Sequence, residues 1–187
     1  EGLKTDAIDV SNSIEQVKPD VNIIIDADPC FGACDLADNK VNHHIDLVVH
    51  FEHTPLPIKT DCPVLFIEAS SSSDIVAPIE DALNGLDEST ATVGIITTAQ
   101  HMHKLNQMKE VIQSHGYKVK VDSGKGTSIA QVLGCNFTSI KNLDVDEIIY
   151  VGSGDFHALG VRLFTKKKVI LADPFTGKSR DIEEFYD

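Results

Sequence analysis

The chain has 187 residues, of which 42% are hydrophobic, and its formal net charge is −13. This length and composition suit one large domain or two small ones with buried cores, whereas the acidic balance argues against nonspecific binding of nucleic acid. No signal-peptide pattern is visible, and every apolar run is far shorter than the roughly 20 residues of a membrane-spanning helix, so we expect a protein of the reducing cytoplasm.

Short β-rich runs alternate with helical patterns along the chain, which is typical of an α/β fold with mostly parallel sheets. A helical pattern comes first, at 4–17. Strands are predicted from apolar runs at 22–27, 44–51, 63–69, 92–98, 117–122, 146–152 and 167–173. The stretch 69–90 begins with a serine run, carries one short amphipathic helix and separates the two halves. Between 100 and 115, apolar side chains recur at helical spacing.

The two halves contain related patterns. Each has a small-residue turn that ends in Cys, then a largely polar stretch, an apolar strand, and an acidic residue shortly before His. Cys34 matches Cys135, 101 positions later, and His53 matches His157, 104 positions later. We therefore predict two copies of one α/β lobe, at 1–88 and 89–187, whose mostly parallel sheets surround a pseudo-symmetry axis.

The four cysteines allow two interpretations. A single Cys is most often a small buried hydrophobe, and this interpretation is favoured for Cys30 and Cys62, which have no counterpart in the other half. Cys34 and Cys135 instead occupy matched loop positions. Because α/β folds bind ligands at the carboxyl ends of their strands, we expect these two thiols to converge on one site.

Five motifs, which span nearly the whole chain, carry a family resemblance. They are DADPCFGACDLAD (26–38), VHFEHTPLP (49–57), AQVLGCN (130–136), YVGSGDFHALG (150–160) and ADPFTG (172–177). In this order they resemble the motifs of diphthamide synthase, the archaeal 3-amino-3-carboxypropyltransferase that acts on elongation factor 2. The resemblance implies a homodimer of three-lobed subunits, in which each lobe gives one cysteine to a single 4Fe-4S cluster.

The implied chemistry agrees with this number of ligands. Three thiolates can hold a 4Fe-4S cluster and leave one iron open, and the resemblance implies that this iron engages the sulfonium end of S-adenosylmethionine. The chain lacks the CxxxCxxC loop of ordinary radical enzymes of this cofactor class, so the likeness is to an atypical type. In that type, a reductant protein or small-molecule donor supplies an electron. The cofactor then releases an aminocarboxypropyl fragment, which is added to a histidine carbon of elongation factor 2.

Matched polar residues indicate where the cofactor binds. HFEHTPL and GSGDFHAL each follow an apolar strand, so their polar side chains should lie at the carboxyl ends of the sheets near the matched cysteines. Gly154 lets the backbone approach a ligand closely. Asp155 can accept hydrogen bonds from the amino group or ribose of S-adenosylmethionine, and His53 and His157 complete the expected site. The alternative is that both histidines are core residues bonded to backbone carbonyls.

The repeat also predicts that residues 1–187 are part of a longer chain. The second half opens with a strand before its helix, whereas the first begins almost at its helix and so lacks a leading strand. The resemblance implies a third lobe, with the third cysteine ligand, beyond Asp187.

Two other functions stay open. A two-lobed α/β domain with incidental cysteines could bind a small anionic ligand in its cleft. Alternatively, Cys30, Cys34 and nearby histidines could hold structural zinc, since mixed sulfur and nitrogen ligands suit that ion.

Other polar clusters have simpler interpretations. Residues 122–128 contain Gly, Lys and Thr but lack the spacing of a P-loop, so we expect a loop before a helix that leads to the second matched cysteine. Four histidines near the starts of elements are expected to face solvent: His43, His44, His101 and His103.

Overall fold

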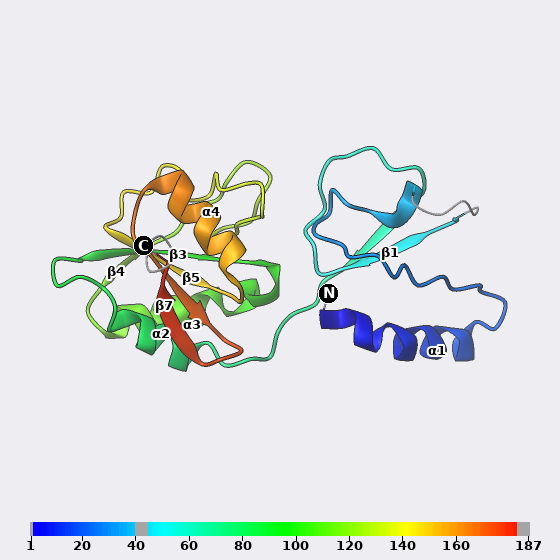
Figure 1. Cartoon of the computed structure of the whole chain (residues 1–187), viewed down its shortest axis with the longest axis horizontal. Helices are drawn as coiled ribbons and strands as arrows, with labels where there is room; N and C mark the ends of the chain where they lie inside the picture. Colours follow the sequence, from blue (N-terminus) through cyan, green and yellow to red (C-terminus); the bar gives the residue numbers. More distant parts are fainter. Residues whose placement is uncertain (1, 40–44, 183–187) are drawn as a thin grey trace. The chain divides into compact units, whose positions relative to one another are not determined.

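The computed structural model describes residues 2–39 and 45–182, which form two compact units (Figure 1). The first unit contains the chain through His50 together with Pro55–Leu65, and the second contains Phe51–Thr54 and the chain from Phe66 onward. His43 and His44 lie outside the described residues. The lobe boundaries at 1–88 and 89–187 stay a prediction. Within the described ranges, no helix is long and apolar enough to cross a membrane.

The first unit begins with helical structure. A 3-10 helix, η1 (Gly2–Asp6), leads into α1 (Ala7–Val17), and the short η2 (Ala37–Asn39) follows later. The predicted strand at 22–27 is wrong, because the chain is irregular there and Ile24 and Ile25 are 47% and 45% exposed. A strand needs a neighbour to pair its backbone groups, and the apolar run alone does not supply one.

Strands β1 (Val48–Phe51) and β2 (Val64–Ile67) form a two-stranded sheet. The Val48 N–H donates to the Pro63 carbonyl at 3.0 Å, and the Glu52 N–H donates to the Ile67 carbonyl at 2.8 Å. Because both partners advance in the same direction, the two strands run parallel. This confirms the strands predicted around these positions, although both are shorter than expected.

The second unit is built on a five-stranded sheet in the order β4-β3-β5-β6-β7. Its strands are β3 (Thr92–Thr97), β4 (Lys118–Lys120), β5 (Glu147–Val151), β6 (Val169–Asp173) and β7 (Lys178–Asp181). The first four are mutually parallel and β7 is antiparallel to β6. The mixed α/β fold with parallel sheets is therefore confirmed, as are the four strands predicted in this half. Strand β7 was not predicted.

Helices cover both faces of this sheet. The helices are α2 (Val76–Leu83), α3 (Leu105–Ser114), which continues the 3-10 helix η3 (Ala99–Lys104), and α4 (Asp155–Thr165). Neighbouring residues of β3 point to opposite faces: Ile95 packs in a core with α2 and α3, and Ile96 in a core with α4. Figure 1 shows α2 and α3 on one side of the sheet and α4 on the other. Such double coverage explains why β5 and β6 are almost continuously apolar.

Two further expectations for the second unit are wrong. No helix leads to Cys135, because residues 121–146 consist of turns, bends and isolated bridges. Short polar side chains bond the backbone of this loop: the Gly124 N–H donates to the Thr127 hydroxyl, and the Thr138 N–H donates to the side-chain oxygen Oδ1 of Asn136. Such bonds compete with helix formation. His101 is not solvated but only 3% exposed, whereas His103 is exposed as expected.

Candidate functional site

The Cys34 thiol is exposed on a tight turn in the first unit. The Asp35 N–H donates to the Gly32 carbonyl at 3.0 Å and closes this turn. Ala33 and Leu36, on either side of the cysteine, are each only 5% exposed. These two apolar side chains anchor the turn and leave the intervening thiol facing outward.

A polar hollow of about 230 Å³ borders Cys34. It is also lined by Asp35, Leu36, Asp38, Ile58, Lys59 and Asp61. The Asp61 N–H donates to the Asp38 carboxylate at 2.8 Å, which joins the two chain segments that form the hollow. The thiol therefore opens onto a surface that carries both positive and negative charge.

Cys30 differs from Cys34, since it is only partly exposed and its thiol has nearby partners. Its Sγ lies 3.2 Å from the Asp35 carbonyl oxygen and 3.5 Å from that of Gly32. A ring nitrogen of His50, a residue that is 8% exposed, lies within 4.8 Å of the same sulfur. Sulfur and imidazole nitrogen are zinc ligands, so this pair keeps a metal-binding role for Cys30 open.

The Cys135 thiol is exposed on a turn in the second unit. Leu133 and Asn136 exchange backbone hydrogen bonds of 3.0 and 3.1 Å across this turn. A Cβ atom added at Gly134 would lie only 2.5 Å from the Phe156 ring, so this ring packs directly on the glycine backbone. The contact brings the turn that carries Cys135 against the first turn of α4.

The glycines before α4 have local structural reasons. Gly154 precedes the helix with φ of +74°, a conformation that favours glycine. A Cβ at Gly152 would lie 2.5 Å from the Tyr150 hydroxyl. Asp155 begins the helix, and its carboxylate accepts a hydrogen bond from the Arg180 guanidinium of β7. Close approach to a ligand is thus not the only reason for glycine here.

His157 packs between two aromatic rings. Its ring stacks on Tyr150 at a centroid distance of 6.0 Å and meets the edge of Phe156 at 5.4 Å. Burial lowers the pKa of His157, and a positive charge on His53 would lower it further. Burial also lowers the pKa of His53, which the Glu52 carboxylate partly opposes. Both imidazoles are therefore held toward their neutral forms.

The second unit thus brings together five of the predicted features: the Cys135 turn, Gly154, Asp155, His157 and the segment that carries His53. Cys34 belongs to the first unit, so its convergence with Cys135 stays a prediction. Sequence reasoning missed the residues that support this site, which are Gln100, Gln131, Gly134, Tyr150, Phe156 and Arg180. The quoted motifs contain Gln131, Gly134, Tyr150 and Phe156, but they do not show which residues these contact, because the contacts join distant parts of the chain.

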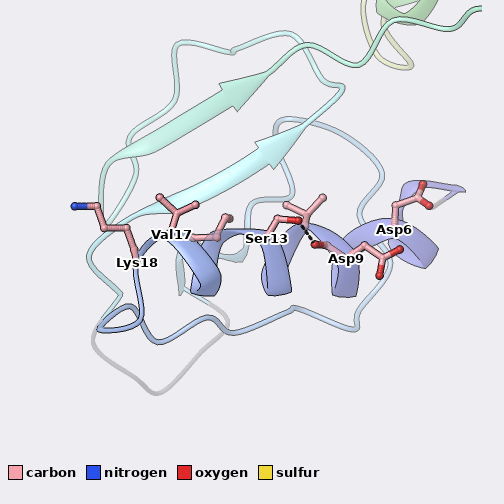
Figure 2. Close-up of a pocket in the computed structure, with 7 residues that line it drawn as sticks. Asp6, Asp9, Ser13, Val17 and Lys18 are labelled. Carbon is pink, nitrogen blue, oxygen red and sulfur yellow. Dashed lines mark hydrogen bonds between the residues drawn. The ribbon is translucent and has the colours of Figure 1, made fainter.

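A larger open hollow of about 620 Å³ follows α1 (Figure 2). Its walls are Asp6, Asp9, Val10, Ser13, Ile14, Val17 and Lys18. The Ser13 hydroxyl donates to the Asp9 carbonyl at 2.7 Å, within the helix itself. Because these lining residues include no thiol or imidazole, we place the chemistry at the cysteine-bearing turns instead.

Comparisons with known proteins show which proteins this chain resembles. The family model described as "Putative diphthamide synthesis protein" matches residues 1–187. The chain is 30% identical over 181 residues to 2-(3-amino-3-carboxypropyl)histidine synthase of Pyrococcus horikoshii, covering 94% of this chain and 52% of that protein. It is 28% identical over 191 residues to the same synthase of Methanocaldococcus jannaschii, covering 94% and 49%.

A solved structure of a related protein also matches this chain. The crystal structure of Dph2 from Pyrococcus horikoshii with a 4Fe-4S cluster matches with a TM-score of 0.83 and 28% identity, covering 98% of this chain and 55% of that chain. The chain therefore spans about half the length of the relatives that it matches.

Proposed function

Because this chain belongs to the diphthamide synthesis family, we propose that the protein transfers a 3-amino-3-carboxypropyl group from S-adenosylmethionine to a histidine of elongation factor 2. A carbon–sulfur bond of the cofactor breaks and releases methylthioadenosine, and a carbon–carbon bond to the imidazole forms as the acceptor carbon loses its hydrogen as a proton, so the overall transfer is redox-neutral. The names of the relatives and the cluster of the Dph2 neighbour support this proposal. We further propose that the protein forms a homodimer, receives electrons from an external reductant and works in the cytoplasm.

Two exposed thiols on tight turns are the observation that carries the proposal. Iron–sulfur clusters are held by cysteine thiolates, which need open access to iron. Cys34 and Cys135 fit this requirement, and we assign them as two ligands of a 4Fe-4S cluster, with the third thiolate from outside residues 1–187. When bound, the cluster supplies the electron for a radical cleavage of the cofactor.

The first turn of α4 is the proposed binding site for S-adenosylmethionine. Gly154 leaves the first backbone N–H groups of the helix uncovered, and these groups lack partners within the helix. The Asp155 carboxylate accepts hydrogen bonds from the amino group or the ribose hydroxyls, and Arg180 holds this carboxylate in place. His53 and His157, both favoured as neutral rings by burial, offer hydrogen bonds without adding charge.

A transfer assay tests the proposed function. The complete protein is reconstituted anaerobically with iron and sulfide, reduced, and given carboxyl-labelled S-adenosylmethionine and elongation factor 2. We expect label on the elongation factor, and none on a variant of that factor whose acceptor histidine is replaced by alanine. A fully reconstituted, reducible protein that labels neither would overturn the proposal.

Binding measurements test the assigned cofactor residues. Asp155→Ala and His157→Ala should each weaken binding of S-adenosylmethionine by about tenfold, the effect of roughly one lost hydrogen bond, while the iron content stays unchanged. Asp144→Ala is the matched control, since its carboxylate is fully exposed and pairs with Lys120 elsewhere in the second unit. Unchanged affinity in both variants would remove these residues from the site.

The closeness of Cys30 and His50 favours zinc as a second candidate. Metal analysis of protein purified without reconstitution separates the two functions. One equivalent of zinc that is lost in both Cys30→Ala and His50→Ala would support a structural zinc site. Iron and sulfide that survive both substitutions would support the cluster assignment to Cys34 and Cys135.

A further inference from the structure

Two glutamine side chains hold the segment Phe51–Thr54, which carries His53, on the second unit. The Gln100 side-chain amide donates to the Glu52 carboxylate. The Gln131 side-chain amide donates to the Thr54 hydroxyl. The two hydrogen bonds therefore lie immediately before and after His53.

The backbone of this segment needs support from its surroundings. Glu52 has φ of +80°, in the left-handed region that residues other than glycine seldom adopt. Such conformations persist only where neighbouring contacts hold them. The Glu52 N–H donates to the Ile67 carbonyl at 2.8 Å, and the His53 N–H donates to the Phe51 carbonyl at 3.0 Å. The turn at Glu52 sets the direction in which the His53 side chain leaves the chain.

The orientation of the Gln131 amide is determined by its other partners. Its side-chain oxygen accepts a hydrogen bond of 3.0 Å from the Ser128 N–H, so its NH₂ group must face Thr54. The residue is 2% exposed. Its backbone carbonyl accepts a bond of 2.6 Å from the Ser139 hydroxyl, and its backbone bridges to Thr97 at the end of β3. Gln131 is thus a rigid, buried donor at the edge of the sheet.

His157 has two aromatic neighbours in the second unit. His157 stacks on Tyr150 and meets Phe156 edge-on, and a positive charge on His53 would lower the pKa of His157. His157 lies in helix α4, which fixes its position. His53 lies in a segment that forms neither helix nor strand beyond Phe51. Its position therefore depends on the bonds that hold that segment.

We propose that Gln131 and Gln100 are positioning residues, which fix Phe51–Thr54 on the second unit and so set the position of His53. The inference rests on the proposed function insofar as the two histidines belong to the cofactor site. Gln131 is the principal member of the pair, because its amide is buried and has a single possible orientation. Gln100 acts on Glu52, and so supports the left-handed turn.

Amide hydrogen exchange tests the positioning in the full chain without cluster or cofactor. Gln131→Leu should speed the exchange of the Glu52 and His53 amides by about five- to tenfold, the factor that one buried hydrogen bond represents. Thr54→Val breaks the same bond but leaves Ser128 paired, so it should have the same effect even if Gln131→Leu folds poorly. In Gln131→Glu, one carboxylate oxygen can accept from Ser128 and the other from the Thr54 hydroxyl, so wild-type exchange should return.

The control makes the same chemical change at an exposed position of α3, Gln113→Leu, which should leave these amides unchanged. Unchanged exchange in both Gln131→Leu and Thr54→Val would overturn the inference. The double variant should exchange no faster than either single one, because both lose one shared bond.

The transfer assay then separates this inference from the proposed function. If the histidines bind the cofactor, Thr54→Val should raise the KM for S-adenosylmethionine by about the same factor as it raises exchange, and Gln131→Glu should restore it. Faster exchange with unchanged KM and kcat would confirm the positioning and remove the histidines from the cofactor site. Slow exchange together with a raised KM would instead overturn the positioning role.

Discussion

At the scale of single residues, Tyr150 organises the candidate site of the second unit. Its side chain is 1% exposed, stacks on His157 and lies against the Gly152 backbone. Burial raises the pKa of its phenol, so the hydroxyl stays protonated, and its hydrogen bond with Thr98 only partly opposes this shift. The ring therefore acts as a neutral, fixed platform for His157.

Gly152→Ala tests this close packing. The new methyl group would lie 2.5 Å from the Tyr150 hydroxyl, so the ring or the backbone must shift. We expect a loss of about 1–3 kcal/mol in the free energy of unfolding, which is typical of overpacking, measured by urea denaturation. Gly32→Ala serves as control, because its new methyl group would meet its nearest atom, the Cys34 sulfur, at an ordinary 3.4 Å. Equal stability of the two variants would contradict the prediction.

His101 should contribute to the pH dependence of stability. Burial, together with the charges of Lys104 and His103, lowers its pKa, and its Nδ1 has no hydrogen-bond partner among the residues described. The folded state favours the neutral ring, so its stabilising effect is complete above about pH 6.5 and is lost as the pH falls through the lowered pKa. His101→Gln should therefore flatten the fall in unfolding free energy between pH 7.5 and 5.

Urea unfolding at several pH values measures this slope. His103→Gln, at an exposed position of the same 3-10 helix, should change the slope less than His101→Gln, because it removes only one of the charges that lower the pKa of His101. Some slope should remain in His101→Gln, because the pKa values of His53 and His157 are lowered in the same direction. A slope identical to that of the parent protein would show that His101 is not the responsible group.

At the scale of elements, hydrophobic patterning predicted the buried strands but failed at β7 and at 22–27. Strands β3, β5 and β6 have continuous apolar runs because helices cover both faces of the sheet. Strand β7, with the sequence KSRD, has no such run, and pairs with β6 through the turn in which Gly177 has φ of +68°. The run at 22–27 has the composition of a strand, but no strand among the described residues pairs with it. Pairing partners, not composition, decided these cases.

The candidate site was predictable only in part, for a related reason. Matched motifs gave Cys135, Asp155 and His157, because these residues recur at comparable positions in the two halves. The contact of Gly134 with Phe156 and the hydrogen bond of Gln131 to Thr54 join distant segments. These residues lie in the quoted motifs, but the motifs do not show that they contact one another, so their supporting roles emerge only from the fold.

Helix α2 depends on an acidic residue just before its start. The Asp74 carboxylate accepts hydrogen bonds from the Val76 and Ala77 N–H groups at 3.0 and 3.2 Å, and both bonds lower the pKa of Asp74. These N–H groups lack partners inside the helix. Asp74→Ala should therefore lower the free energy of unfolding by about 1 kcal/mol, a typical cost of a lost cap.

Thermal or urea unfolding measures this loss. Glu80→Ala is the matched control, since it removes the same charge from an exposed position of the same helix. The control should change stability by less than about 0.5 kcal/mol. If both variants behaved alike, the carboxylate of Asp74 would not be acting as a cap.

At the scale of the whole molecule, each unit contributes one exposed thiol. Cys34→Ala and Cys135→Ala, made in the complete protein, should each lose or degrade the cluster, because a ligand thiolate has no substitute. Iron and sulfide content, visible absorption and the paramagnetic signal of the reduced protein measure this loss. Cys62→Ala is the control and should retain the cluster. Loss of the signal in Cys30→Ala and Cys62→Ala, but not in Cys34→Ala, would show that the assignment is wrong.

The outer strands of the five-stranded sheet are rich in charge. Lys118 and Lys120 are exposed on β4, and Lys178 and Arg180 are exposed on β7. An edge strand offers unpaired backbone groups to any extended chain that approaches, and charged side chains along it make such pairing costly. The same charges that removed β7 from the hydrophobic pattern therefore protect this sheet against joining, edge to edge, with the sheet of another copy.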